Sequence, residues 1–283
     1  MAEDRHRPSV WINELTWEEV ADYLRSDDLI IWPIGATEQH GPAGPLGVDT
    51  YVAIALAEDA AKRTNTLCVP PMWYGDSAHH LGFAGTLSLR TETLMLVMHD
   101  VLRSLEKHGF RKVLCINGNK SANLPAMIGA AKNMREFEMP HVFIAVIDPM
   151  KMARGIAPQI KETPEHHGGE LELSHVWHKF PGLIREDQLT DETVSFPDVF
   201  GPYSHNDLLA GGGDTIDIPW TSGEQRAFAP TGSFTPSRKA SPQKGQRYHE
   251  YQVDVIVRFI EWLRQYHGPL GNTDAAPHVV PVS

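Results

Sequence analysis

Short apolar runs alternate with segments of helical spacing along the first half of the chain, and this alternation constrains the fold most strongly. The runs are rich in β-branched residues: LIIWPI (29–34), TLCVPP (66–71), KVLCIN (112–117) and HVFIAVI (141–147). Between them, the spacing predicts helices over 50–63, 91–108 and 123–136. Strands that alternate with helices of this length predict βαβ units and a mainly parallel sheet. We therefore expect a single α/β domain with three α/β/α layers.

The rest of the chain gives weaker signals. Thr16 and Glu19 form a predicted capping box at the start of an N-terminal helix. A closing helix is expected over about 244–266, with one apolar stripe: Val253, Ile256, Val257, Ile260 and Leu263. Residues 180–243 are rich in turn signals and predict a long excursion without a second core. We place the domain at 1–267 and a loose tail at 268–283.

Composition limits the classes of function. The chain has 283 residues, of which 41% are hydrophobic, and a formal net charge of −11. Clustered Lys and Arg are needed to track phosphates, so nucleic acid is not an expected partner. No stretch approaches the roughly 18 apolar residues of a membrane span, and the first residues do not resemble a signal peptide. We therefore predict a cytoplasmic protein without a membrane partner, in which Cys68 and Cys115 are buried free thiols.

The segment GATEQHGPAGPLGVD (35–49), directly behind the first apolar run, carries Glu38, His40 and Asp49. In an extended segment Glu38 and His40 project to the same side, as a pair of metal ligands would. The glycines and prolines let the chain double back to Asp49, and Glu170 or Glu172 could complete the set. Carboxylates with imidazole suit Zn²⁺, Mn²⁺ or Fe²⁺, and such an ion activates water.

Simpler interpretations of these residues stay open. Asp49 could cap the helix that begins at Thr50, and Glu38 and His40 could be ordinary loop residues. Further polar clusters follow the other apolar runs, at YGDSAHHLGFAGT (74–86), NGNKSAN (117–123) and EHHGGELELSH (165–175). Their histidines could be solvated: His79, His80, His166 and His167. In an open parallel sheet, however, ligands bind beyond the carboxyl ends of the strands, where such clusters lie.

Taken as a set, the motifs are specific. They are PIGATEQHGPAGPLGVDT (33–50), YGDSAHHLGFAGTLSLR (74–90), HGFRKVLCINGN (108–119), HHGGELELS (166–174) and ASPQKGQ (240–246). In this order, over about 30–246, they resemble the creatininase (creatinine amidohydrolase) family. The resemblance implies a metal-dependent hydrolase on a single α/β domain, assembled as a homohexamer and acting on a small polar substrate.

The resemblance also implies roles for individual residues. The implied metal ligands are Glu38, His40, Asp49 and Glu170. His167 would transfer a proton, and Lys120 and Glu172 are further candidate catalytic residues. The candidate substrate-binding residues are Asp76, Ser77, His80, Asn119 and Asn123.

The chain departs from the family pattern at one position. Where the family has N-G-H-G-G-N with a metal-binding histidine, this chain has NGNKSAN, with Asn119 at that position and Lys120 next to it. An amide oxygen is a poorer Zn²⁺ ligand than imidazole. We therefore expect one Zn²⁺ or Mn²⁺ per subunit, although two are possible. Lys120 could replace the missing positive charge and stabilise an oxyanion, or it could be a solvated lysine.

These observations leave three hypotheses. The first is ring opening of an oxidised cyclic polyol such as a dehydro-inosose, because the polar residues around the site suit a hydroxyl-rich compound. The second is hydrolysis of a cyclic amide or formamide, as in creatinine or a formylamino-pyrimidine. The third is a catalytically silent, metal-binding structural subunit.

Overall fold

The computed structural model describes residues 8–209, 216–268 and 270–271. In this part of the chain the strands are β1 (Leu29–Ile34), β2 (Leu67–Cys68), β3 (Lys112–Asn117) and β4 (Phe143–Ile147). They form one sheet in the order β2-β1-β3-β4, and every neighbouring pair is parallel. The predicted α/β class with a parallel central sheet is confirmed.

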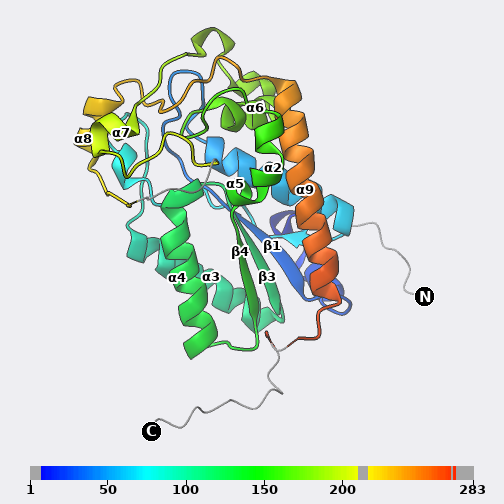
Figure 1. Ribbon diagram of the computed structural model, residues 1–283. Helices are drawn as coiled ribbons and strands as arrows, with labels where there is room; N and C mark the ends of the chain where they lie inside the picture. Colours follow the sequence, from blue (N-terminus) through cyan, green and yellow to red (C-terminus); the bar gives the residue numbers. More distant parts are fainter. Residues whose placement is uncertain (1–7, 210–215, 269, 272–283) are drawn as a thin grey trace.

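Helices cover both faces of this sheet (Figure 1). The longer ones are α2 (Val48–Thr64), α3 (Thr91–His108), α4 (Lys120–Phe137), α6 (Glu170–Lys179) and α9 (Pro242–Arg264). The shorter ones are α1 (Trp17–Tyr23), α5 (Pro149–Met152), α7 (Phe196–Phe200) and α8 (Ser222–Phe228). Single 3₁₀ turns are η1 (Ile12–Glu14), η2 (Ala78–His80), η3 (Ala153–Gly155), η4 (Ala157–Gln159), η5 (Pro181–Leu183) and η6 (Glu186–Gln188).

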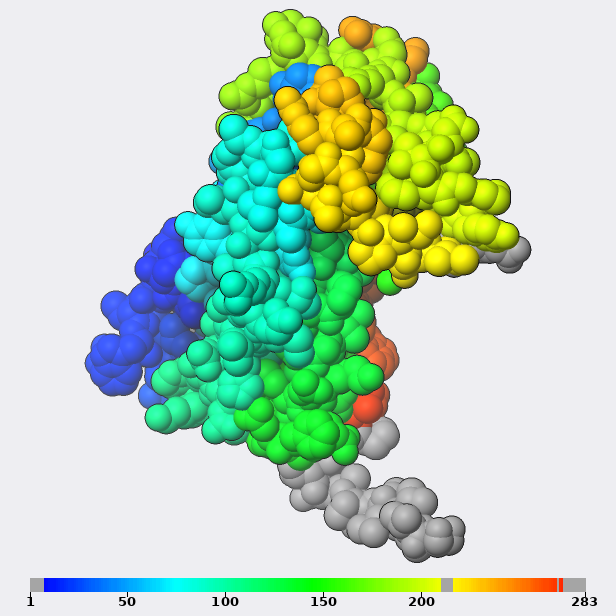
Figure 2. Space-filling model, turned by 90° about the vertical axis from the view of Figure 1, so that its left-hand side faces the viewer, coloured from blue at the N-terminus to red at the C-terminus, as the bar shows by residue number. Residues whose placement is uncertain are grey.

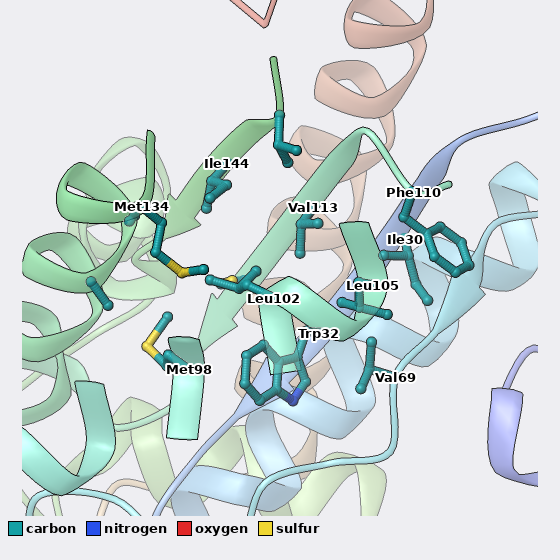
Figure 3. Close-up of a cluster of buried hydrophobic side chains, with 14 of the residues drawn as sticks. Ile30, Trp32, Val69, Met98, Leu102, Leu105, Phe110, Val113, Met134 and Ile144 are labelled. Atoms are coloured by element: carbon teal, nitrogen blue, oxygen red, sulfur yellow. The ribbon is translucent and has the colours of Figure 1, made fainter. Parts of the chain in front are cut away.

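Strand alternation divides the core into two layers. Ile30 and Trp32 of β1 point into a cluster with α3 and α4, where Met98, Leu102 and Met134 pack against them (Figure 3). The intervening residues of β1 point into the opposite cluster, with α2 and α9: Leu29 and Ile31. Since successive side chains of a strand face opposite sides of the sheet, one continuous apolar run supplies both layers.

The observed boundaries of the predicted strands and helices lie close to the expected ones, and the differences have local causes. The predicted strand over 66–71 shortens to Leu67–Cys68, since Pro70 and Pro71 follow and lack the N–H that a sheet ladder needs. The predicted helix over 123–136 begins earlier, at Lys120. This places Lys120 in the first turn of α4, at the end of β3.

The helix signals at both ends of the domain are confirmed. The Thr16 side chain accepts a hydrogen bond from the Glu19 backbone N–H, and the Thr16 backbone N–H donates to the Glu19 carboxylate at 2.7 Å. Helix α9 starts at Pro242 after the cap residue Ser241. All the predicted stripe residues of α9 are buried: Val253, Ile256, Val257, Ile260 and Leu263. Cys68 and Cys115 are buried and free, as expected.

The excursion over 180–243 is more structured than its sequence suggests. It contains α7 and α8 and a small apolar cluster of its own, with Val194, Phe196 and Phe234 at the centre and Phe200 and Trp220 packed against them. The expectation of an excursion without a core is therefore wrong in this respect. Most of the predicted tail, 272–283 with residue 269, lies outside the described residues.

A glycine fixes the end of β3 against the helix that begins after the first loop. A Cβ on Gly118 would lie 1.9 Å from the carbonyl oxygen of Asp49. We predict that Gly118→Ala lowers the free energy of unfolding by about 1–3 kcal/mol, because backbone must shift. Gly182→Ala is the control, since a Cβ there meets no heavy atom within 4 Å. Denaturant unfolding of both variants checks this, and equal stabilities would contradict it.

Candidate active site

The polar clusters meet at the carboxyl edge of the sheet. Each is carried there by a different element: the loop after β1, the loop holding η2 after β2, the start of α4 after β3, and the segment before and within α6. Two overlapping groups of side chains result, Glu38 with His40 and His167, and His40 with Asp49 and Glu172. Within each group the ligand atoms lie within 4.8 Å of one another, and all five residues are buried.

The second group fits a cation. His40 Nε2 lies 3.2 Å from Asp49 Oδ1 and 3.7 Å from Glu172 Oε1. His40 Nδ1 is 3.1 Å from the carbonyl oxygen of Glu38; when the ring is neutral, this contact places the proton on Nδ1 and leaves Nε2 as a lone pair. Among the described residues, Asp49 Oδ2 has no hydrogen-bond partner, and His40 Nε2 forms no well-aligned hydrogen bond beyond its contacts with the Asp49 and Glu172 carboxylates, although both atoms are buried. Buried polar atoms are normally partnered, so a metal ion suits these two.

Asp49 does not cap α2, so the alternative interpretation of Asp49 as a helix cap is excluded. The cap residue of α2 is Gly47, and Asp49 lies inside the first turn. Burial raises the pKa of Asp49, while His40 opposes this rise. The Asp49 side chain is thus turned toward the site.

Glu38 is surrounded by polar side chains from three other segments. Ser77 Oγ and Asn119 Nδ2 donate to its Oε2 at 2.6 and 2.9 Å. His80 Nε2 and His167 Nδ1 lie 3.3 and 3.6 Å from its Oε1. Burial and the nearby Asp49 raise the pKa of Glu38 well above its ordinary value. Asn119 therefore supports a carboxylate of the site through its amide N–H groups.

The ligand predicted at Glu170 is wrong, and Glu172 is the residue that faces the site. The Glu170 carboxylate accepts hydrogen bonds from the backbone of Glu162 and Thr163, at 3.0 and 2.9 Å, and pairs with Lys244. Residues two apart on a helix point about 200° apart, given 3.6 residues per turn. With Glu172 directed at His40, Glu170 must point away from it.

Lys120 lies beside the predicted ligands, so it is not a solvated lysine. Its Nζ is 2.6 Å from Glu172 Oε1 and 2.9 Å from the carbonyl oxygen of His166. Burial by itself would lower the pKa of Lys120, but Glu172 and Glu165 raise it above its ordinary value. Lys120 is therefore a fixed positive charge at the site.

The histidines of the site are buried and mostly neutral. Burial and neighbouring cationic groups hold the pKa values of His80 and His167 well below the ordinary value. His167 Nε2 is 2.5 Å from the Gln39 carbonyl oxygen and 2.9 Å from the Gln39 side-chain nitrogen. The shorter contact favours the tautomer with the proton on Nε2, which leaves Nδ1 facing Glu38 as an acceptor. His80 Nδ1 is approached by the amide groups of Gln39 and Gln225 at 2.9 and 2.6 Å. The predicted proton transfer by His167 stays a prediction.

A cavity of about 480 Å³ opens onto these groups. Of the predicted substrate-binding residues, Asp76, His80 and Asn119 line it. Ser77 instead holds Glu38, and Asn123 is fully buried, bonded to the backbone of Asp76 and Gly35 at 2.8 and 3.0 Å. Ser77 and Asn123 therefore position the site, and we correct their predicted role.

The excursion supplies the wall of the cavity that the sequence did not reveal. It contributes Leu208, Asp217, Ile218, Pro219, Trp220 and Phe234. Helix α8 lies over the segment around η2, as the yellow and cyan surfaces in Figure 2 show, and Arg226 sits 4.7 Å above the Phe83 ring. Local spacing holds no signal for this contact, because it joins segments far apart in the chain.

The fold and the cluster define a class of protein, an α/β protein with a candidate metal site at the carboxyl edge of a parallel sheet. The family profile described as Creatininase: Creatinine amidohydrolase matches residues 13–260. The chain therefore belongs to the creatininase family, and it is a hydrolase of that family.

Individual relatives fit this assignment. The chain is 31% identical over 209 residues to 3-dehydro-scyllo-inosose hydrolase of Thermotoga maritima, a match that covers 71% of this chain but only 65% of that protein. It is 28% identical over 265 residues to creatinine amidohydrolase of Pseudomonas putida, covering 88% and 95% of the two chains. A solved structure named Creatininase Mn is similar with a TM-score of 0.73 and 25% identity, over 90% of this chain and 98% of that one. In the described part of this chain, every helix is too short or too polar to cross a membrane.

The assignment of Glu172 as a ligand can be tested against its neighbour on the same helix. We predict that Glu172→Gln weakens Mn²⁺ binding more than the about 10- to 100-fold typical of residues that only support ligands. Glu170→Gln should keep the Mn²⁺ affinity and lower the free energy of unfolding by about 1–3 kcal/mol, because it weakens a buried hydrogen-bond network. Metal titration and denaturant unfolding measure the two effects. Loss of Mn²⁺ affinity in Glu170→Gln alone would reverse the assignment.

Metal binding should release protons. Burial acts to lower the pKa of His40, but Asp49 and Glu172 raise it well above its ordinary value. In the metal-free protein His40 therefore carries a second proton near neutral pH, and an ion must displace it. We predict that Mn²⁺ affinity rises as pH increases toward the raised pKa of His40. Calorimetry in buffers of different ionisation enthalpy counts the protons released, and a pH-independent affinity without proton release would exclude this account.

Proposed function

We propose that this chain opens the ring of an oxidised cyclic polyol, such as a dehydro-inosose, by hydrolysing a carbon–carbon bond of its β-dicarbonyl unit. The proposal depends on one observation, the buried ammonium of Lys120 at 2.6 Å from Glu172. The likeness to an inosose hydrolase supports the same substrate class.

One divalent ion, Zn²⁺ or Mn²⁺, is proposed for the site. His40 Nδ1 contacts the Glu38 carbonyl oxygen, so both candidate groups depend on the single remaining nitrogen, Nε2. One ion there would take Glu38, His40, Asp49 and Glu172 as its ligands. A second ion is disfavoured by the Lys120 charge, because like charges at short range repel strongly away from water. When bound, such an ion supplies Lewis-acid chemistry, acidifying water and polarising a carbonyl group.

Lys120 matches the charge that develops on a β-dicarbonyl substrate. The oxygen of a water molecule bonds to one carbonyl carbon, and the bond from that carbon to the central carbon breaks. Its electron pair passes to the central carbon and is shared with the second carbonyl oxygen as an enolate. A fixed ammonium beside that oxygen stabilises the enolate, because it needs no reorganisation during the reaction.

Proton transfer completes the reaction. His167 is neutral, and in the tautomer with its proton on Nε2 the free Nδ1 accepts a proton from the attacking water and returns it to the central carbon. The product is a ring-opened keto acid, in which the water oxygen remains on the carboxyl group and one proton is released by ionisation. Asp76, His79 and Asn119 line the cavity and are placed to accept or donate hydrogen bonds to ring hydroxyls.

Hydrolysis of a cyclic amide or formamide is the second candidate. It is favoured by the match with a creatinine amidohydrolase over 88% of this chain. Amide hydrolysis develops one oxyanion and must protonate a leaving nitrogen, so Lys120 would have a smaller effect on it.

The substrate class can be tested directly. Purified enzyme loaded with Mn²⁺ should convert 3-dehydro-scyllo-inosose to a ring-opened acid and leave creatinine and formylamino-pyrimidines unchanged. Metal analysis should return one ion per chain. Release of ammonia or formate without polyol turnover would favour the amide alternative, and absence of turnover in a metal-loaded, folded protein would favour a silent subunit.

Lys120 has a matched control in Lys244. Both side chains are 17% exposed, and each pairs with a buried glutamate of α6. Lys120→Met should lower kcat by at least about 100-fold, the effect typical of losing one oxyanion donor. Lys244→Met should lower the melting temperature and leave kcat within about twofold. Comparable kcat values in the two variants would refute the role of Lys120.

A further inference from the structure

A second, much smaller cavity lies behind the Lys120 and Glu172 side chains. Its volume is about 30 Å³, and Lys120 and Glu172 line both this cavity and the large one. The opposite wall is made by His175 of α6 and by Tyr248 and Gln252 of α9. The cavity therefore lies between the helix that carries a predicted metal ligand and the helix that closes the domain.

Two buried polar atoms at this cavity have no hydrogen-bond partner among the described residues. They are His175 Nδ1 and Gln252 Oε1, and their residues are 1% and 0% exposed. Leaving such an atom unsatisfied is unfavourable, because it gives up its hydrogen bonds to water and gains none in the folded protein. Two of them beside the same cavity indicate a bound group that the side chains themselves do not supply.

A chain of hydrogen bonds fixes which kind of atom His175 presents. Burial acts to raise the pKa of Asp59, but hydrogen bonds from Lys179 and His249 hold that pKa below its ordinary value. The Asp59 carboxylate is therefore ionised and can only accept. His249 Nε2, 2.8 Å from Asp59 Oδ2, must carry the proton, so His249 Nδ1 is a lone pair. His175 Nε2, 2.8 Å from that atom, must then donate to it.

It follows that His175 Nδ1 is an unprotonated acceptor. This requires both rings to be neutral, and burial holds the pKa values of His175 and His249 below the ordinary value. Gln252 Nε2 donates to the Pro149 carbonyl oxygen at 2.8 Å, so the side-chain atom of Gln252 that is left without a partner is its oxygen. Both unpartnered atoms are acceptors, and they cannot satisfy each other. The Tyr248 hydroxyl, which interacts with the Gln252 side chain, carries one proton and can serve only one of the two acceptors.

The other charged groups at the cavity are already engaged. Glu165 accepts from the backbone N–H groups of Leu171 and Glu172 at 2.7 and 3.1 Å. Asp148 caps α5 by accepting from Met150 at 3.0 Å. The acidic ligands that a second metal ion would need are therefore occupied, whereas a neutral donor with two hydrogens fits the two acceptors. A volume of about 30 Å³ exceeds the roughly 10–15 Å³ that one water molecule requires.

We propose that this cavity is a binding site for one water molecule, which donates to His175 Nδ1 and Gln252 Oε1 and so fixes α6 against α9. His175 follows Glu172 by three residues, about one turn of the helix. A continuous chain of hydrogen bonds thus runs from the water through His175 and His249 to Asp59. By holding α6 in place, this chain positions Glu172. The consequence for metal binding rests on Glu172 being a ligand, whereas the water site itself does not.

The tautomers test the water site without any variant. Nitrogen NMR of the histidine side chains in the metal-free protein should show both His175 and His249 protonated on Nε2 only. A crystal structure at a resolution that defines ordered waters should show one at this cavity. Protonation of His175 on Nδ1, or a cavity without density, would overturn the proposal even if the enzyme is active on a polyol.

A variant pair tests the positioning role. Gln252→Met removes the Oε1 acceptor, together with the Nε2 donor to Pro149, at nearly constant volume. Gln246→Met on the same helix replaces a glutamine whose side chain donates to Glu250 at 2.8 Å on the surface. Gln252→Met should lower the melting temperature by several degrees and weaken Mn²⁺ binding about tenfold, while Gln246→Met changes neither. A lower melting temperature with unchanged Mn²⁺ affinity would show a purely structural water and refute positioning. If Gln252→Met does not fold, the tautomers of the wild-type protein still decide the water site.

Discussion

The site depends on the burial of three carboxylates around one imidazole. Glu38, Asp49 and Glu172 are only 2%, 2% and 6% exposed, and His40 lies between them at 1%. Each uncompensated buried charge costs several kcal/mol, and like charges held together raise one another's pKa values. In the metal-free protein, bound protons and the Lys120 ammonium offset this cost. A divalent ion would neutralise the carboxylates more completely, and this geometry therefore suits a metal ion.

The neighbouring pair Asn119 and Lys120 changes how the family site is balanced. An imidazole at position 119 would present a lone pair to a metal, whereas the Asn119 amide presents N–H groups to Glu38 at 2.9 Å. The next residue brings a permanent positive charge to Glu172. Relative to the family pattern, position 119 thus carries a hydrogen-bond donor in place of a metal ligand, and position 120 adds a cation. Both changes fit the proposed single metal ion and the proposed substrate, on which two oxygens become negative.

The excursion after α6 forms one wall of the cavity above the cluster. Its aromatic residues pack on one another, with Trp220 stacked on Phe200 at 5.3 Å between ring centroids, and this packing holds the apolar wall in place. The Gln225 side chain of α8 contacts His80 Nδ1, which the Gln39 side chain also contacts. A cavity with a charged floor and an apolar wall excludes water from the reacting groups and strengthens their electrostatic interactions.

Much of this architecture follows from the local spacing of residues in the sequence. The sequence by itself determined the order of the four strands and of α1, α2, α3, α4 and α9, the capping box at Thr16, the stripe on α9 and the gathering of Glu38, His40 and Asp49, because these depend on residues close together in the chain. Only the tertiary structure decided that Glu172 faces the site and Glu170 does not. Their directions depend on how α6 is rotated against α9 and the sheet, and that rotation is set by contacts among segments distant in sequence. The cavity wall from the excursion was decided in the same way, since only packing brings it over the carboxyl edge of the strands.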